Sequence, residues 1–181
     1  VANNIKSTAS AILILLMVGA LAGTWMVSGI IPSMIYYGLQ ILSPAVFLPA
    51  TLIICSVISI ATGSSWTTSA TVGIALIGIG GALGFDLGMV AGAVISGAYY
   101  GDKLSPMSDT TNLAPAMAGT DLFTHIKYMT LTTIPTYIIT LILFIILGLS
   151  IEVKGDVNTN ELLKAITTSF NVSGWLFLVP V

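Results

Sequence analysis

The stretch that decides the fold is residues 128–150, which read YMTLTTIPTYIITLILFIILGLS and contain no charged side chain. A helix needs about 20 mostly apolar residues to cross the hydrocarbon core of a bilayer. The apolar residues here run together instead of alternating with polar ones, which favours a helix over a strand of a membrane barrel. The stretch therefore predicts a membrane-spanning helix, interrupted only by Pro135.

The composition of the whole chain indicates the same environment. Of its 181 residues, 56% are hydrophobic and only 7% are charged, and Lys6 is the only charged residue among the first 85. A soluble domain carries about a quarter charged residues. With 5 Lys and Arg and 1 Cys, the chain has neither a basic face for nucleic acid nor a disulfide framework. We expect the lipid bilayer as its surroundings and no nucleic-acid partner.

We expect an all-α polytopic membrane protein with about five to six membrane segments, some of them discontinuous. Residues 44–61 form a second clear span, and residues 23–32, 62–71 and 101–119 interrupt the apolar pattern with glycine, proline and hydroxyl residues. Residues 1–181 form a single transmembrane region, with a hydrophilic loop at 151–164 that holds five charges. Because the sequence lacks an initial Met and stops inside an apolar run, we expect it to be a fragment of a longer chain.

Small residues recur every four positions at Gly80, Gly84, Gly88, Gly92 and Ser96. On a helix, this spacing makes a groove in which another backbone approaches closely, so we interpret the series as a helix-packing surface. The chain can turn near Asp86, so only Gly88, Gly92 and Ser96 are expected to share one face.

The stretch richest in chemistry is residues 101–115, GDKLSPMSDTTNLAP, which holds Asp102, Lys103 and Asp109 in a chain that is otherwise almost uncharged. Its glycine and two prolines interrupt a regular helix and free backbone carbonyls. The neighbouring oxygen donors are Ser105, Ser108, Thr110, Thr111 and Asn112. Carboxylates, hydroxyls and carbonyls are the ligands of a hard cation, so this stretch predicts a sodium site. One Cys and one His, far apart, argue against a transition metal.

An exposed loop with solvated charges would have a similar composition. Two features favour a membrane site instead. The preceding apolar run, residues 87–100, is about 21 Å long as a helix, too short for a core of about 30 Å. The chain also becomes apolar again at residues 113–118, as if a half-helix resumed. Short or interrupted segments of this kind mark the binding sites of transporters.

A second candidate stretch is residues 62–71, in which seven of ten residues carry hydroxyls. Most hydroxyls in membrane helices bond to their own backbone or join helices, but this density beside a Gly63 break exceeds what packing needs. We therefore add four of them to the predicted sodium ligands: Ser64, Ser65, Thr67 and Thr68.

Residues 101–115 closely resemble the characteristic sequence of NhaC-type sodium/proton antiporters. Residues 23–32, 62–66 and 121–125 are similar to other parts of that family, in the same order. The resemblance implies a multi-pass transporter of the bacterial inner membrane, built on repeated helix groups, that exchanges sodium for protons. The family also includes members that exchange malate and lactate coupled to both ions, and the sequence does not separate the two activities.

The resulting hypothesis gives Asp102 and Asp109 the central role. A buried carboxylate is costly when charged, so it takes up either a proton or sodium but not both. Such competition, with access alternating between the two sides, is sufficient for antiport. Lys103 would balance one aspartate when the site is empty. No resident cofactor is expected, and the oligomeric state stays open, a homo-oligomer included.

Two other classes of protein are alternatives. An intramembrane aspartyl protease would use a pair of aspartates, Asp86 with Asp102 or Asp109, that share a proton and activate water. The hydroxyls and the lysine would serve no purpose in that enzyme. A channel subunit would conduct ions downhill without obligatory proton exchange.

Overall fold

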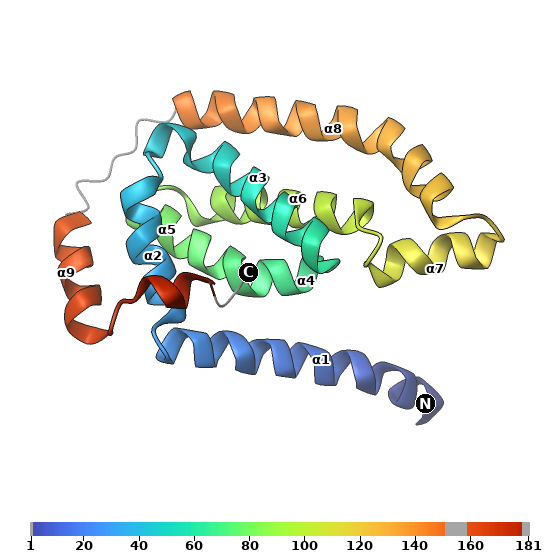
Figure 1. Ribbon diagram of the computed structural model, residues 1–181, viewed down its shortest axis with the longest axis horizontal. Coiled ribbons are helices and arrows are strands. Elements are labelled where there is room, and N and C mark those ends of the chain that lie inside the picture. Colours follow the sequence, from blue (N-terminus) through green and yellow to red (C-terminus); the bar gives the residue numbers. More distant parts are fainter. Residues whose placement is uncertain (1, 151–158, 179–181) are drawn as a thin grey trace.

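The computed structural model describes residues 2–150 and 159–178 of the chain, and within these ranges every regular element is a helix (Figure 1). The predicted all-α class is confirmed. In chain order the elements are α1 (Ala2–Val27), α2 (Ile30–Ile41), α3 (Pro44–Thr62), α4 (Ser65–Thr68), the π-helix η1 (Ser69–Gly73), α5 (Ile74–Ala82), α6 (Leu87–Leu104), α7 (Asp109–Ala118), α8 (Leu122–Ser150), α9 (Thr159–Ser169) and the 3₁₀-helix η2 (Gly174–Leu178).

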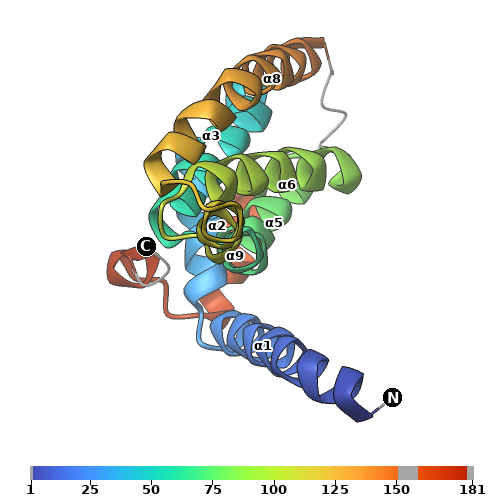
Figure 2. The same cartoon turned by 90° about the vertical axis from the view of Figure 1, so that its right-hand side faces the viewer.

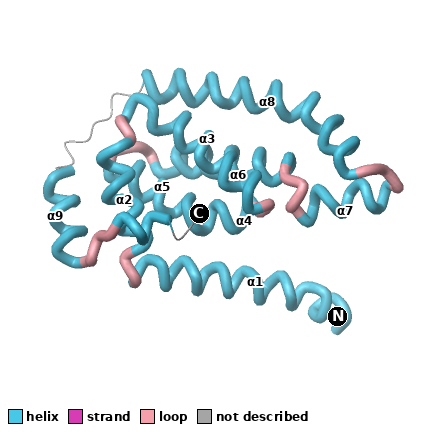
Figure 3. Tube along the Cα trace, viewed as in Figure 1, coloured by secondary structure: helices cyan, strands magenta, loops and turns pink. Residues whose placement is uncertain are grey.

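Two of these helices, α3 and α8, are long and apolar enough to cross a membrane by themselves. A third span is possible if the end of α1, Gly19–Val27, is counted together with α2, although the two meet at an angle of 70°. The number of full-length spans among the described residues is therefore lower than the expected five to six segments. The other helical segments are shorter pieces separated by the predicted interruptions, and Figure 3 shows the short turns that join them.

The core of the described structure lies where α3 and α6 pack side by side. Leu48 and Leu52 of α3 and Val90 and Val94 of α6 are fully or almost fully buried. The two backbones approach closely at Gly97, where an added Cβ would meet the Leu52 carbonyl oxygen. Four residues further along α6, an added Cβ at Gly101 would meet the Ser56 carbonyl oxygen. Glycine is therefore needed at both positions.

The close-packing surface of α6 differs from the predicted one. Gly84 lies in the turn between α5 and α6 with φ +84°, and Gly88 is exposed, so the series that starts at Gly80 does not continue along one helix face. The buried small residues of α6 are instead Ala93, Gly97, Ala98 and Gly101, of which Ala93, Gly97 and Gly101 keep the four-residue spacing. Small residues at a four-residue spacing do form the packing surface of α6, but at other positions than predicted, because the turn between α5 and α6 interrupts the predicted series.

Helix α8 lies along both α3 and α6, and the N-terminal part of α1 extends away from the other helices (Figure 1 and Figure 2). Helix α9 follows the predicted hydrophilic loop. Residues 151–158 of that loop lie outside the described residues, and from Thr159 onward the chain is helical rather than a loop.

Candidate functional site

The first interruption that builds the site separates α3 from α4. Helix α3 ends at Gly63, which adopts a left-handed conformation with φ +67°, and Ser64 is extended. Glycine is required here for a second reason, because an added Cβ would lie 2.6 Å from the Met107 carbonyl carbon. Ser64 then begins α4 as its N-cap, where its Oγ accepts a hydrogen bond from the Thr67 N–H at 3.2 Å.

The second interruption separates α6 from α7. Helix α6 continues through Gly101 and ends at Leu104, four residues later than the expected break. Ser108 begins α7 as its N-cap, and its Oγ accepts from the Thr111 N–H at 3.4 Å. Pro115 lies inside α7 instead of ending it, since a proline removes only one backbone donor. The sequence therefore predicted an interruption in this stretch, but placed it too early.

The two interruptions lie against each other. Ser105, just after α6, donates from its Oγ to the Ile60 carbonyl oxygen at 2.7 Å, near the end of α3. Ser59 of α3 donates to the Ala98 carbonyl oxygen of α6 at 2.6 Å. With the Gly63–Met107 approach, these contacts join the ends of α3 and α6. We call this region, residues 59–65 with 98–108, the helix-break junction; Figure 1 shows α4 and α7 at this end of α6.

Asp102 lies at the centre of the helix-break junction, in the last turn of α6. Its Oδ2 accepts a hydrogen bond from the Ser65 Oγ at 2.8 Å, so the carboxylate reaches across to the start of α4. Its Oδ1 is buried and has no hydrogen-bond partner among the described residues. A buried carboxylate oxygen without a donor is costly, and such a group calls for a proton or a cation. Asp102 is the predicted site residue whose surroundings fit an ion ligand best.

The remaining predicted ligands of residues 108–112 hold the second interruption together. The Thr111 hydroxyl donates to the carbonyl oxygens of Asp102 at 3.1 Å and Lys103 at 3.2 Å, and so caps the end of α6. Asn112 donates from Nδ2 to the carbonyl oxygens of Pro106 and Ser108, both at 2.7 Å. The Thr111 hydrogen bonds therefore attach the first turn of α7 to the end of α6, and the Asn112 hydrogen bonds hold the connecting turn, from which α7 runs on beyond α6 (Figure 1).

The hydroxyls of Ser108 and Thr110 are 3.0 Å apart, so they form a pair at the start of α7. At the first interruption, the Thr67 Oγ1 donates to the Ser64 Oγ at 3.1 Å, and the Thr68 Oγ1 donates to the Ser64 carbonyl oxygen at 2.9 Å. All five hydroxyls thus have local partners. The Ser64 Oγ already accepts hydrogen bonds from both the N–H and the Oγ1 of Thr67, whereas Thr67 and Thr68 can still offer a lone pair to a cation.

Asp109 and Lys103 lie apart from the Asp102 carboxylate. Asp109 is exposed, and its Oδ1 accepts from the N–H of its neighbour Thr110 at 2.7 Å. Lys103 is exposed as well. Within the described chain, the hydrogen bonds to the two carboxylates come from Ser65 and Thr110 and not from Lys103. The roles of Asp109 as an ion ligand and of Lys103 as a charge partner remain predictions.

The structure gives no support to an aspartate pair that includes Asp86. Asp86 caps the N-terminal end of α6, where its Oδ1 accepts from the Met89 N–H at 3.0 Å. Asp102 lies in the last turn of the same helix, and a rise of about 1.5 Å per residue places the two about 24 Å apart. Two carboxylates at that distance cannot share a proton.

Sequence reasoning missed two features of this region. Ser59 and Ser105 make the hydrogen bonds that join the two interruptions. Ser105 was expected as an oxygen donor and not as a link to α3, and only the position of Ser59 near the end of an apolar run could have drawn attention to it. The π-helix η1 directly follows α4 and contains the buried Thr71. Such wide turns occur frequently at functional sites, but no residue pattern announces them.

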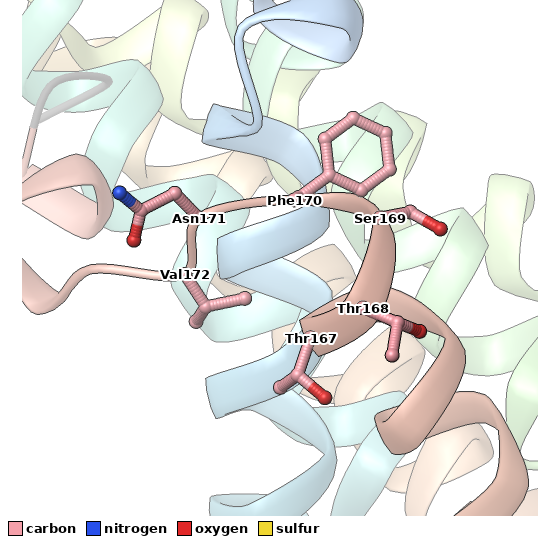
Figure 4. Close-up of a pocket in the computed structure, with 6 residues that line it drawn as sticks. All are labelled: Thr167, Thr168, Ser169, Phe170, Asn171 and Val172. Carbon is pink, nitrogen blue, oxygen red and sulfur yellow. The ribbon is translucent and has the colours of Figure 1, made fainter.

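The structure has two notable hollows besides the helix-break junction. One, of about 500 Å³, is lined by the consecutive residues 167–172 where the chain turns after α9, and none of its labelled side chains is charged (Figure 4). It contains no group from another element and is a weak candidate for a binding site. The second lies between α6 and α8 and includes Lys103. Within the described ranges, no group of three or more His, Cys, Asp or Glu could hold a metal ion.

Interrupted helices that meet at a buried carboxylate in an apolar, all-helical membrane protein define the class of secondary transporters. A model of the Na⁺/H⁺ antiporter family matches residues 2–111 and 97–181 of this chain. The chain belongs to that family, which confirms the resemblance found in the sequence.

Curated relatives extend this result. The chain is 46% identical over 183 residues to the malate-2H⁺/Na⁺-lactate antiporter of Bacillus subtilis, covering 100% of this chain and 39% of the relative. It is 46% identical over 170 residues to the Na⁺/H⁺ antiporter NhaC of Alkalihalophilus pseudofirmus, covering 94% of this chain and 37% of the relative. It is also 44% identical over 155 residues to the arginine/ornithine antiporter of Halobacterium salinarum, covering 86% of this chain and 32% of the relative.

The chain therefore spans about two fifths of the length of the first two of these curated relatives. No solved structure matches it.

Proposed function

We propose that the full-length protein exchanges sodium ions for protons across a membrane, with Asp102 as the group that binds either ion. Family membership supports the reaction class. The observation that carries the choice of residue is the Asp102 carboxylate, with one oxygen held by Ser65 and the other buried without a partner in the described chain.

The chemistry follows from the cost of a buried charge. An ionised carboxylate with an unpaired oxygen is unstable in a medium that excludes water, so Asp102 binds a proton or sodium to become neutral. The two ions compete for the same oxygen. If the protein opens alternately to either side, sodium bound on one side is released on the other when a proton takes its place, and this sequence is an antiport cycle.

The neighbouring hydroxyls complete the proposed sodium site. Ser65 donates to Asp102 when the carboxylate is charged, and its oxygen can turn a lone pair toward a bound cation. Further ligands are proposed among the hydroxyl and amide groups at both interruptions: Ser64, Thr67, Thr68, Ser108, Thr110, Thr111 and Asn112. Asp109, exposed at the start of α7, is proposed as a second carboxylate that attracts cations toward the junction.

A second candidate function is the exchange of organic acids coupled to sodium and protons. It is favoured by the 46% identity to a relative named for malate and lactate antiport. In this function Asp102 keeps its role and the organic acid needs a site of its own. We also propose a multi-pass location in the bacterial inner membrane. Homo-oligomerisation stays a prediction.

The test compares two neutralised aspartates. The full-length protein is reconstituted in vesicles, and proton movement is measured with a pH-sensitive dye after a sodium gradient is imposed. Asp102→Asn is expected to abolish sodium-driven proton movement, because an amide cannot take up a proton or balance sodium. Asp109→Asn is expected to reduce the rate only in part, because its carboxylate is exposed.

The control is Asp86→Asn. This change removes a carboxylate at the far end of α6, and asparagine is an equally good N-cap, so transport should be unchanged. Normal sodium-driven proton movement in Asp102→Asn would contradict the assignment of Asp102.

A further inference from the structure

A groove of about 390 Å³ lies between α6 and α8, outside the helix-break junction. All nine residues that line it end in a hydroxyl or an ammonium group. Helix α6 contributes Ser96, Tyr99, Tyr100 and Lys103, and α8 contributes four threonines and a tyrosine. In a chain that is 56% hydrophobic, a groove between two helices whose lining residues all carry a hydroxyl or an ammonium group is unexpected from packing alone, although the ring faces, methyl groups and methylenes of these residues also contribute apolar surface.

The charge in this groove is positive and uncompensated. Lys103 contributes an ammonium group, and no lining residue carries a carboxylate. Within the described residues, the hydroxyls of Tyr99 and Tyr100 make no hydrogen bond, so they can donate into the groove. A cation would be repelled by Lys103, whereas an anion would find the ammonium and several hydroxyl donors.

The threonines of α8 contribute differently. The Thr136 hydroxyl donates to the Thr132 carbonyl oxygen at 2.8 Å, and the Thr140 hydroxyl donates to the Thr136 carbonyl oxygen at 2.9 Å. Their protons are engaged, so they offer lone pairs and methyl groups to a ligand. A ligand with its own hydroxyl group could donate to these lone pairs.

The floor of the groove is held in place by contacts to a third helix. The rings of Tyr100 and Tyr137 stack with their centroids 3.8 Å apart. The Tyr137 hydroxyl is 3.0 Å from the Ser56 Oγ of α3, which ties α8 to the core. The groove is thus lined by α6 and α8 and braced by a hydrogen bond from α3, and its volume lies within the range of about 300–1,000 Å³ that is usual for small-molecule sites.

We propose that this groove binds a small carboxylate anion, with Lys103 opposite the carboxylate and the tyrosine hydroxyls as further donors. One ammonium group matches a single carboxylate charge. The site shares no lining residue with the Asp102 carboxylate, so it is a second site on the same helix. It would give the protein a place for an organic acid separate from the place for sodium.

The experiment measures equilibrium binding of radiolabelled L-lactate to the full-length protein in phosphatidylcholine vesicles without sodium. Because no sodium is present, a failure to bind lactate can be distinguished from a failure of sodium–proton exchange. The wild type is expected to bind lactate saturably, and uncharged lactamide should not compete. Lys103→Gln should weaken binding by about tenfold or more, since a charge-assisted hydrogen bond is lost. The lactate affinity of Lys103→Arg should lie between those of the wild type and Lys103→Gln.

The matched control is Lys127→Gln, which removes an exposed lysine of α8 outside the groove and should leave binding unchanged. If Lys103→Gln is poorly folded, Tyr99→Phe removes one exposed hydroxyl and should still weaken binding. A lipid phosphate presents similar chemistry, so binding is repeated with phosphatidylglycerol in the vesicles. Three results would each overturn the proposal. Phosphatidylglycerol could displace lactate from the protein, the wild type could show no saturable lactate binding, or Lys103→Gln could bind lactate as well as the wild type does.

Discussion

Helix α6 presents two very different sides to its neighbours. Towards α3 and α4 it has small residues, close backbone contact and paired polar groups, including the Ser65–Asp102 hydrogen bond. Towards α8 it has a polar groove with Lys103 and hydroxyls that lack partners in the described chain. Consecutive residues of a helix point about 100° apart, so Asp102 and Lys103 serve different surfaces although they are adjacent in sequence. The two proposals therefore assign a cation site and an anion site to two sides of one helix end.

The largest effect is expected from Gly97→Ala on the side towards α3. The new Cβ would meet the Leu52 carbonyl oxygen and lie 2.9 Å from the Cys55 Cβ, and neither backbone can rotate away. Overpacking of this kind should cost about 2–3 kcal/mol. The measurement is the thermal unfolding midpoint of the purified full-length protein in detergent.

The matched control for that change is Gly92→Ala. The nearest atom to its added Cβ is in Phe144 at 3.9 Å, which is an ordinary contact. The midpoint should stay the same or rise slightly, because alanine favours a helix more than glycine. If both substitutions lowered the midpoint equally, the packing of α6 against α3 would be no tighter than its packing against α8.

A smaller effect is expected from Ser65→Ala, which leaves the Asp102 carboxylate but removes the hydroxyl beside it. Because the proposed site uses the Ser65 oxygen as a ligand of bound sodium, and polar contacts to charged groups are worth more than neutral ones, the apparent sodium affinity should fall by about tenfold. Transport at saturating sodium should be retained. Ser69→Ala, in η1, is the control and should not change the affinity. An unchanged sodium affinity in Ser65→Ala would separate the serine from the ion site.

Much of the fold could be predicted from the sequence, because apolar runs and breakers are local signals. The predicted span at residues 44–61 is within one residue of α3, and all three predicted interruptions are present. The predicted span at residues 128–150 is the greater part of α8, which begins earlier, at Leu122. Hydropathy does not distinguish a surface helix from the first turns of the span that follows it.

The candidate site was harder to predict, because it depends on where a helix ends. Gly101 usually weakens a helix, but here α6 continues through it since the contact with Ser56 requires a residue without Cβ. Asp102 therefore lies on a helix, whereas Asp109 begins the next one and is exposed. The sequence placed both aspartates in one site, and only the three-dimensional contacts distinguish them.

The central claim is that Asp102 binds either a proton or sodium, and proton release on sodium binding tests it most directly. Sodium chloride is added to the full-length protein in weakly buffered detergent solution, with choline chloride as the salt control. The account predicts saturable proton release by the wild type and none by Asp102→Asn. Equal proton release by Asp102→Asn, in a protein that keeps its unfolding midpoint, would contradict the account.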